Sequence, residues 1–283
     1  MTDETAPEVG QTGLTVQQGA GQAPTALDLA HAAMEAAPGD DAARLRFFER
    51  LADSELFILL DKDPEGDSIS PEVFDTGEGR FVLVFDREER LAQFANRIVP
   101  YAALSGRVVA QMLAGQGIGV GVNLEVAPSS ILIPDTAMGW LAETLAHAPG
   151  EVEAAITEVY PPRGLPEALL TALDAKLATA GGLAQMAYLA AVSYETGGRG
   201  HLLAFVGARE GAEAALAKAV GEALTFSGVE AGALDVGFFA ASDSMAARLA
   251  RVGLRFDLPK AQTQPNHAPV MPGSDPDRPP RLK

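Results

Sequence analysis

The chain has no cysteine, which excludes disulfides, thiol nucleophiles, thiolate metal sites and iron–sulfur clusters. Histidine is scarce, and none of the four residues stands in a spacing that zinc sites use: His31, His147, His201 and His267. Only five lysines occur, and none follows a glycine as the lysine of a phosphate-binding Walker loop does. The sequence therefore predicts no metal and no cofactor.

Long apolar runs are also missing. The most apolar stretch, Leu183 to Val192, is far shorter than the roughly 20 residues of a membrane-spanning helix. The first residues, MTDETAPEVGQTG, lack the basic start and apolar stretch of a secretory signal. The net charge of −17, without a basic patch, opposes binding to phosphate backbones and anionic membranes. We expect a soluble cytoplasmic protein that binds neither nucleic acid nor membrane.

Length and composition predict two folded domains between two tails. Apolar residues make up 47% of the 283 residues, which is typical of globular proteins and sufficient for two cores. Residues 1–23 and the proline-rich residues 259–283 have little to bury, so both are predicted to be disordered. The break at Pro149-Gly150 divides the remainder into domains at 24–149 and 150–258.

Apolar periodicity in the first domain indicates alternating helices and strands. Asp86 and Glu89 have the spacing of a capping box, with Asp86 as the cap, and Asp135 is expected to cap a later helix. The predicted helices cover 26–37, 41–54, 87–94, 102–115 and 135–149. The predicted strands cover 55–60, 71–76, 80–86, 97–101, 116–125 and 129–134, of which the second and third form a hairpin around Gly77-Glu78-Gly79.

The second domain has a simpler pattern. Strands are predicted at 151–160, 185–195, 201–208, 233–240 and 254–258, and helices at 166–177, 210–224 and 244–251. Thr196-Gly197-Gly198 indicates a hairpin. The order β-α-β-β-α-β-α-β contains a split βαββαβ unit, which predicts a ferredoxin-like core. The expected fold class is α/β (α+β), with two mixed sheets packed by helices.

Four glycines, Gly115, Gly117, Gly119 and Gly121, suggest a nucleotide-binding loop at first sight. Such loops need a strand before the glycines and a helix N-terminus after them. Here the predicted helix precedes the glycines and the strand follows them, and the G-x-G-x-x-G spacing is absent. A helix end followed by a closely packed strand accounts for them better.

The loop Asp61–Glu72 partly fits the calcium-loop pattern, with Asp61, Asp63, Gly66 and Glu72 in register. Glu65 and Pro71 depart from the pattern, and strands rather than helices are predicted on both sides. We therefore interpret the loop as an acidic, solvated connection between strands.

No nucleophile motif surrounds Ser105 or Ser244. Aspartate and glutamate side chains that meet only on folding are the one route to catalysis that the residues leave open. With no catalytic residue identified, the sequence predicts a protein that is not an enzyme.

The order of segments resembles the SseB family of bacteria, the enhanced serine sensitivity proteins. In the first domain the match lies in ELFILL, PEVFDTGEGRFVLVFDREERLAQF, YAALSGRVVAQML, the stretch 117–123 and Ile131-Leu132-Ile133. In the second it lies in LPEALLTALDAKLATAGGLAQMAYLAAV and HLLAFVGA, which resemble the C-terminal domain of the family. Leu124 stands where the family pattern has proline, so a tight turn is not predicted there. The resemblance implies no enzymatic activity.

The leading hypothesis is a non-catalytic cytoplasmic adaptor or regulatory protein that binds an unidentified protein partner. A glycine-rich strand permits close backbone approach, so the expected partner-binding residues are Gly117, Gly119, Gly121, Asn123 and Glu125. Trp140 is expected either to anchor a partner or to lie on the buried face of its helix. The alternative hypothesis is a small-molecule sensor that holds an amino acid between the domains.

Overall fold

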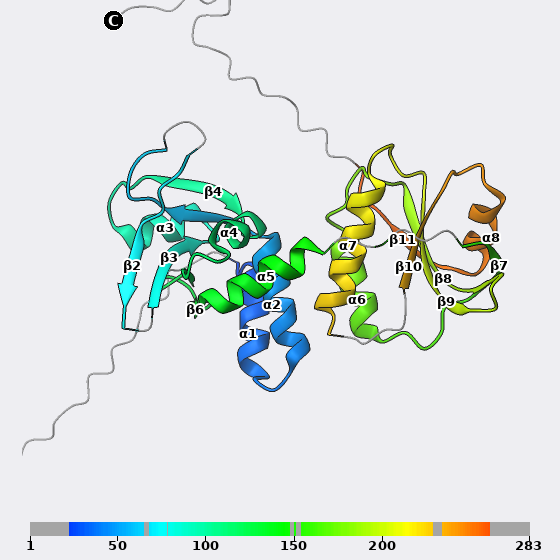
Figure 1. Ribbon diagram of the computed structural model, residues 1–283, viewed down its shortest axis with the longest axis horizontal. Coiled ribbons are helices and arrows are strands. Elements are labelled where there is room, and N and C mark those ends of the chain that lie inside the picture. The colour runs from blue at the N-terminus through cyan, green and yellow to red at the C-terminus, as the bar shows by residue number, and fades with distance from the viewer. Residues whose placement is uncertain are drawn as a thin grey trace, which may run out of the picture.

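The computed structural model contains two sheet-based units side by side (Figure 1). It describes residues 23–64, 68–77, 79–147, 150, 154–228 and 234–260. The described residues before 148 form the first unit, and those from 154 onward form the second. The predicted tails fall outside the described residues, apart from Ala23 and from 259–260. The α/β class with two mixed sheets is confirmed.

The first unit has a six-stranded mixed sheet in the order β4-β1-β3-β5-β6, with β2 paired to β3. The strands are β1 (Glu55–Leu59), β2 (Val73–Thr76), β3 (Gly79–Phe85), β4 (Tyr101–Ser105), β5 (Gly119–Val122) and β6 (Ile131–Ile133). The helices are α1 (Ala26–Ala36), α2 (Asp41–Asp53), α3 (Glu88–Ala95), α4 (Gly106–Leu113) and α5 (Asp135–Ala146). The predicted β2–β3 hairpin is confirmed by antiparallel pairing from Val73–Val82 to Thr76–Gly79.

The two faces of this sheet are covered unequally. The face that carries Ile58, Val84 and Val122 packs against α1, α2, α4 and α5 and forms the main core. The opposite face, which we call the outer face, carries Leu59, Leu83 and the eight-residue helix α3. Large apolar side chains on the inner face are fully buried, and their removal from water stabilises the unit.

Two predicted helix caps are wrong. α3 begins after Arg87, which makes no capping hydrogen bond, and the Asp86 side chain is engaged elsewhere. Asp135 is the first residue of α5, and the cap position is Pro134. Asp86 precedes α3 and Asp135 lies in the first turn of α5, but a spacing rule does not determine which residue takes the cap position.

The predicted helix over 102–115 is also only half correct. Residues 101–105 form β4, which pairs antiparallel with β1 from Glu55–Ser105 to Leu59–Tyr101, whereas the predicted strand 97–101 contributes only Tyr101. Distant pairing with β1 overrides the local helical pattern. Ser105 then caps α4 by accepting a hydrogen bond from the Val108 amide.

The second unit has a five-stranded sheet in the order β10-β9-β8-β11, with β7 also paired to β8. Its strands are β7 (Ile156–Tyr160), β8 (Met186–Tyr194), β9 (Arg199–Val206), β10 (Leu234–Phe239) and β11 (Leu254–Asp257). Its helices are α6 (Glu167–Leu177), α7 (Glu213–Phe226) and α8 (Ser244–Val252). The hairpin between β8 and β9 is confirmed.

The ferredoxin-like arrangement is not confirmed. A split unit needs its first strand between two later ones, whereas β7 pairs antiparallel with its immediate successor β8 at the sheet margin. The parallel pair is β9 with β10, joined directly by α7. The order of elements along the chain is as predicted, but that order does not determine which strands pair.

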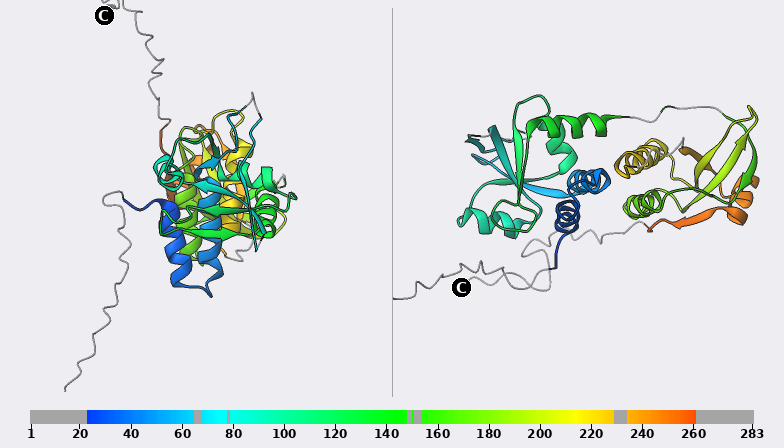
Figure 2. Two further views of the ribbon diagram at one scale, coloured as in Figure 1. Left: turned by 90° about the vertical axis from the view of Figure 1, so that its left-hand side faces the viewer. Right: turned by 90° about the horizontal axis from the view of Figure 1, so that it is seen from below.

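Helices mediate the contact between the units. Figure 1 shows α6 and α7 on the side of the second unit that faces the first, with α8 at the far end. Figure 2 shows the same pair beside α1 and α2 when the molecule is seen from below. Close contacts between α2 and α7 agree with these views.

Candidate functional site

The glycines of β5 are packing positions inside the sheet. β5 pairs with β3 on one side and β6 on the other, so neither edge is free. A Cβ on Gly119 would lie 2.4 Å from the Ile133 carbonyl oxygen and 2.7 Å from the Phe81 ring. A Cβ on Gly121 would lie 2.8 Å from side-chain atoms of both Leu83 and Leu124. These residues therefore make room for neighbouring groups of the same sheet.

The five predicted partner-binding residues do not share one surface. Gly119, Gly121 and Asn123 are buried, whereas Gly117 and Glu125 are exposed at opposite ends of the segment. The physical reason is that β5 is an interior strand, which the sequence could not indicate. A tight turn forms after β5 despite Leu124: Asn123 has a φ of 49°, and its carbonyl accepts a hydrogen bond from the Val126 amide.

Asn123 belongs to a buried polar network behind this turn. Its Oδ1 accepts from the Asp86 amide at 3.1 Å, and its Nδ2 donates to Ser129 Oγ at 2.9 Å. Ser129 Oγ donates in turn to Asp28 Oδ1 at 2.6 Å. The network ties α1 to the carboxyl ends of the parallel strands β3 and β5.

Arg90 is the cation at the centre of this network. Its guanidinium donates to both carboxylate oxygens of Asp28 and, at 2.7 Å, to Asp86 Oδ1. Thr25 Oγ1 donates to the other Asp86 oxygen. Burial by itself raises the pKa of Asp28, but hydrogen bonds from Arg90, Ser129 and the Thr25 amide outweigh it and hold that pKa well below its usual range.

A second charged cluster joins the two units. Lys176 on α6 is 5% exposed, and its Nζ lies 2.7 Å from Asp53 Oδ2, 2.9 Å from Glu222 Oε2 and 3.8 Å from Glu49 Oε1. Arg107 on α4 donates to Glu222 Oε1 at 2.9 Å and to Asp53 Oδ1 at 2.6 Å. We call these five residues the junction cluster. Three come from the first unit and two from the second.

The carboxylates of the junction cluster differ in proton affinity. Burial raises the pKa of Glu49, despite opposing attraction to Lys176 and Arg50. Burial acts in the same direction on Glu222, but hydrogen bonds from Arg107 and Lys176 outweigh it and lower that pKa. Glu49 Oε1 makes no hydrogen bond within the described part of the chain. Folding therefore brings acids together as the sequence analysis allowed.

Neighbouring acids whose pKa values are shifted in opposite directions occur in acid–base active sites. They also occur in ion-pair networks that have a purely structural role. None of the junction cluster residues lines the hollow described below in the second unit. Each cation is already held by at least two carboxylates. The arrangement is suited to holding helices together, and it leaves neither cation free to bind the carboxylate of an amino acid.

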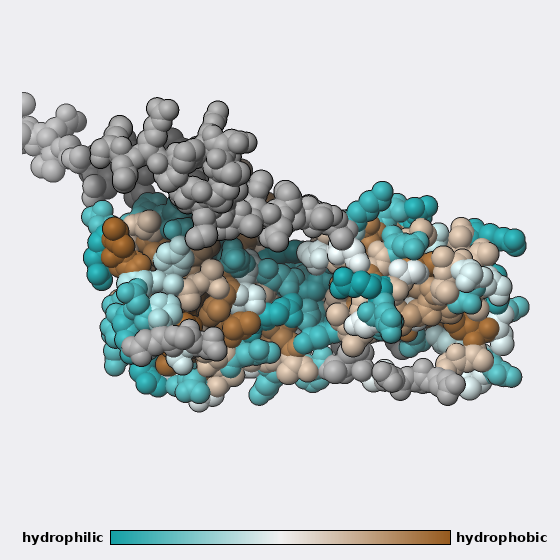
Figure 3. All heavy atoms as spheres, turned by 90° about the horizontal axis from the view of Figure 1, so that it is seen from above, coloured by the Kyte–Doolittle hydropathy of each residue, from teal (hydrophilic) through white to brown (hydrophobic). Residues whose placement is uncertain are grey.

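Aromatic side chains form the apolar part of the junction. Phe226, at the end of α7, is fully buried in the core cluster of the first unit. Its ring centroid lies 6.3 Å from that of Trp140, which in turn lies 5.3 Å from Phe48. Trp140 therefore lies partly on the buried face of α5 and packs against the second unit. Figure 3 shows hydrophilic side chains where the two units meet on the face seen from above.

The histidines and the acidic loop form no metal site among the described residues. His31 is buried edge-on against Phe47, while His147 and His201 each contact a backbone carbonyl. His267 lies outside the described residues. So do residues 65–67 of the loop Asp61–Glu72, including Gly66; Asp61 and Asp63 are exposed.

The fold and the junction define a two-unit α/β protein whose buried charges pair with one another within and between the units. Residues 29–139 match the family model described as the SseB protein N-terminal domain, and this match supports an SseB assignment for that part of the chain. That match lies within the first unit, so the resemblance of the second unit to the family's C-terminal domain stays a prediction. No curated protein and no solved structure matches the chain. Among the described residues, no helix has the length and apolar character needed to cross a bilayer.

Proposed function

We propose that the protein is a non-catalytic cytoplasmic adaptor that binds a protein partner through the outer face of the first unit. The observation that supports this proposal is that the outer face carries exposed apolar side chains that the short helix α3 does not cover. Tyr101 pairs with Leu59 at one end of a cross-sheet row, and Leu132 pairs with Gly121 at the other. Leu132 is 40% exposed, Tyr101 is 36% exposed, and Ile98, three residues before Tyr101 in the chain, is fully exposed. These side chains lie on the same face at its two edges, and exposed apolar side chains on one face favour protein binding.

The charged residues support a binding role over a catalytic one. Arg90 and Lys176, the two most buried cations described above, each hold two or more carboxylates. Removing a partner from such a buried pair destabilises a protein, so these groups have a sufficient structural role. On the outer face, Tyr101 packs edge-on against Phe57 and still leaves 36% of its surface exposed.

A matched pair of leucine substitutions tests the proposal. The full-length tagged chain is recovered from its host as wild type, as Leu132→Lys and as Leu29→Lys, because Leu29 is equally apolar but exposed on α1. We expect a stoichiometric partner with the wild type and with Leu29→Lys, and its loss with Leu132→Lys. Fractionation of the same cells tests the cytoplasmic location. Equal recovery from both variants, or a monomer without partner in every case, contradicts the proposal.

The amino-acid sensor stays an alternative prediction with its own test. A ligand that binds only the native state raises the melting temperature, by an amount that grows with the logarithm of its concentration above the dissociation constant. A thermal-shift screen of the amino acids at millimolar concentration therefore separates the two functions, since the adaptor predicts no shift.

A further inference from the structure

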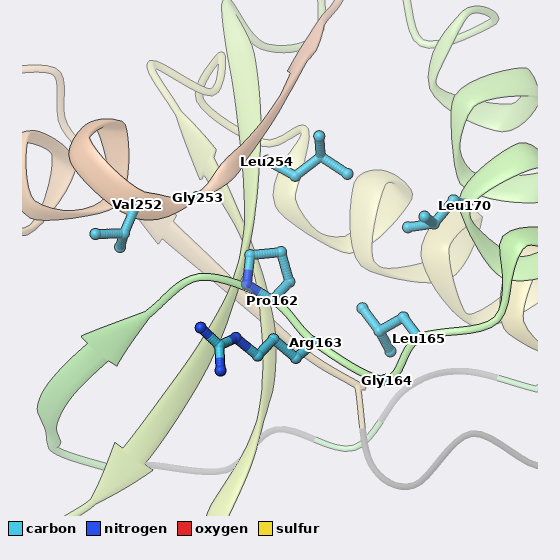
Figure 4. A pocket seen from close by; sticks show the side chains of 8 residues that line it. All are labelled: Pro162, Arg163, Gly164, Leu165, Leu170, Val252, Gly253 and Leu254. Carbon is cyan, nitrogen blue, oxygen red and sulfur yellow. The ribbon is translucent and has the colours of Figure 1, made fainter.

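A hollow of about 370 Å³ opens on the second unit, at a site separate from the outer face of the first. Its apolar wall comes from three segments: Pro162 and Leu165 on the connection to α6, Leu170 on α6, and Leu254 at the start of β11. Figure 4 shows these four side chains around one space. A volume of this size is sufficient for a large side chain and part of its backbone.

The hollow lies where two short edge strands follow one another along β8. β7 pairs with residues 191–194 of β8, and β11 pairs with residues 186–189 on the same side. Among the described residues, no strand pairs with the outer side of either. Tyr160 and Leu254, at the facing ends of these strands, are both exposed. Unpaired edges of this kind bind extended peptides through backbone hydrogen bonds, while pockets select side chains.

The backbone around the hollow is held in place. Gly164 has a φ of +75°, and a Cβ on Gly253 would lie 2.8 Å from the Leu249 carbonyl oxygen. His201 Nε2 lies 3.2 Å from the carbonyl oxygen of Arg163 and steadies the connection to α6. A preformed wall lowers the ordering cost of binding.

Arg163 gives the hollow a positive charge. It is the only charged residue among the eight that line the hollow, and it is exposed. Figure 4 shows its side chain extending past Pro162 towards the Val252 end. Because no acid lines the hollow, this arginine is complementary at short range to an acidic group on a ligand, although the net charge of −17 opposes the approach of an anion.

We propose that this hollow docks an extended, acidic segment of a protein partner. A large aliphatic or aromatic side chain of that segment enters the apolar part, and a neighbouring carboxylate pairs with Arg163. The segment lies along the facing ends of β7 and β11, beyond Thr157, whose carbonyl already accepts a hydrogen bond from Arg248. This site would give the adaptor a second binding surface, and it does not depend on the partner of the first unit.

A fluorescent, acetylated pentapeptide with a central leucine and two aspartates on each side tests the site on the full chain by anisotropy at about 0.15 M salt, which screens its long-range repulsion from the negative chain. We expect a dissociation constant of roughly 0.1 mM or tighter, weakened about ten-fold by Arg163→Glu through loss of a charge-assisted contact. Leu254→Ser should weaken it as well, since Leu254 is exposed and its replacement leaves the core intact.

Arg209→Glu is the matched control, because Arg209 is an exposed arginine of the same unit that does not line the hollow. It should bind the peptide like the wild type. A peptide with lysine in place of aspartate should not be weakened by Arg163→Glu. No binding at about 1 mM overturns the proposal, as does equal binding by the two arginine variants. N-acetyl-leucine that competes at the same concentration as the peptide also overturns it, in favour of a small-molecule site. None of these results bears on the Leu132 test.

Discussion

Single buried charges determine how the helices of this protein meet. Lys176 stands at a position where the periodicity of α6 otherwise places leucine and alanine, and Glu222 stands near Phe226 on α7 in the same way. A charged residue within an apolar stripe is the signal from which the junction cluster could have been suspected. The sequence does not show, however, which opposite charge arrives from the other unit.

Replacing Lys176 should leave the acids of the junction cluster without their most buried cation. We expect Lys176→Met to lower the free energy of unfolding by about 3–5 kcal/mol, because Asp53 and Glu222 then share Arg107 and the buried Glu49 keeps only Arg50 at 3.8 Å. Urea titration of the full chain measures the change. Lys218→Met on α7, which removes a lysine outside the cluster, should cost about 0.5 kcal/mol or less.

Glu49, unlike Lys176, is expected to lower the stability of the folded protein at neutral pH. Because burial raises its pKa above 4.5, the folded state binds the proton more tightly than the unfolded state does. This contribution to stability is present below the unfolded pKa and is lost as pH rises through the folded pKa. We expect Glu49→Gln to be more stable than the wild type at pH 7, with the difference shrinking towards pH 4.5. Unfolding curves at several pH values test this, with the exposed Glu35→Gln as the background. A difference that grows in acid would contradict the assignment.

At the scale of elements, local chemistry predicted most helices and strands but not their neighbours. The hairpin of β2 and β3 could be predicted because its turn and both strands are contiguous. The pairing of β4 with β1 could not, since the partners are more than forty residues apart and the segment has a helical pattern. The sequence predicted that another group lies close to the backbone at the glycines of β5. In the structure, the groups close to Gly119 are the Phe81 ring and the Ile133 carbonyl.

The glycines give a direct test of that interpretation. We expect Gly119→Ala to cost about 2–3 kcal/mol, because its Cβ would meet a backbone oxygen that cannot move freely. Gly139→Ala on α5, where no atom lies within 4 Å of the added Cβ, should instead stabilise the protein by roughly 0.5–1 kcal/mol through helix propensity. Thermal unfolding of both variants provides the measurement. Similar effects at the two positions would refute the packing explanation.

At the scale of the whole molecule, the two units share part of one core. Phe226 is contributed by the second unit but is buried among residues of the first. The predicted boundary at Pro149-Gly150 therefore separates two sheets without separating two independent cores. A break in periodicity predicts where one sheet ends along the chain. It does not predict which later side chains, such as Phe226, pack into the core of that sheet.

Trp140, the only tryptophan, reports on this shared core. We expect Phe226→Ala to lower the free energy of unfolding by about 3–5 kcal/mol and to shift the emission of Trp140 to the red, as water reaches the vacated site. Calorimetry should show one transition for the wild type and two for the variant. Phe238→Ala, which removes a ring stacked on Phe205 inside the second unit, should leave the Trp140 emission unchanged.

The position of Phe226 also has a consequence for synthesis of the chain. All strands and helices of the first unit have been made when α5 leaves the ribosome. The place that Phe226 occupies in its core stays empty until roughly 80 further residues have been made. At ~5–20 residues per second, that interval lasts about 4–16 s. During this time Phe48 and Trp140 are exposed to solvent on an otherwise folded unit. Nascent chains stalled before residue 226 should therefore be the species that chaperones retain.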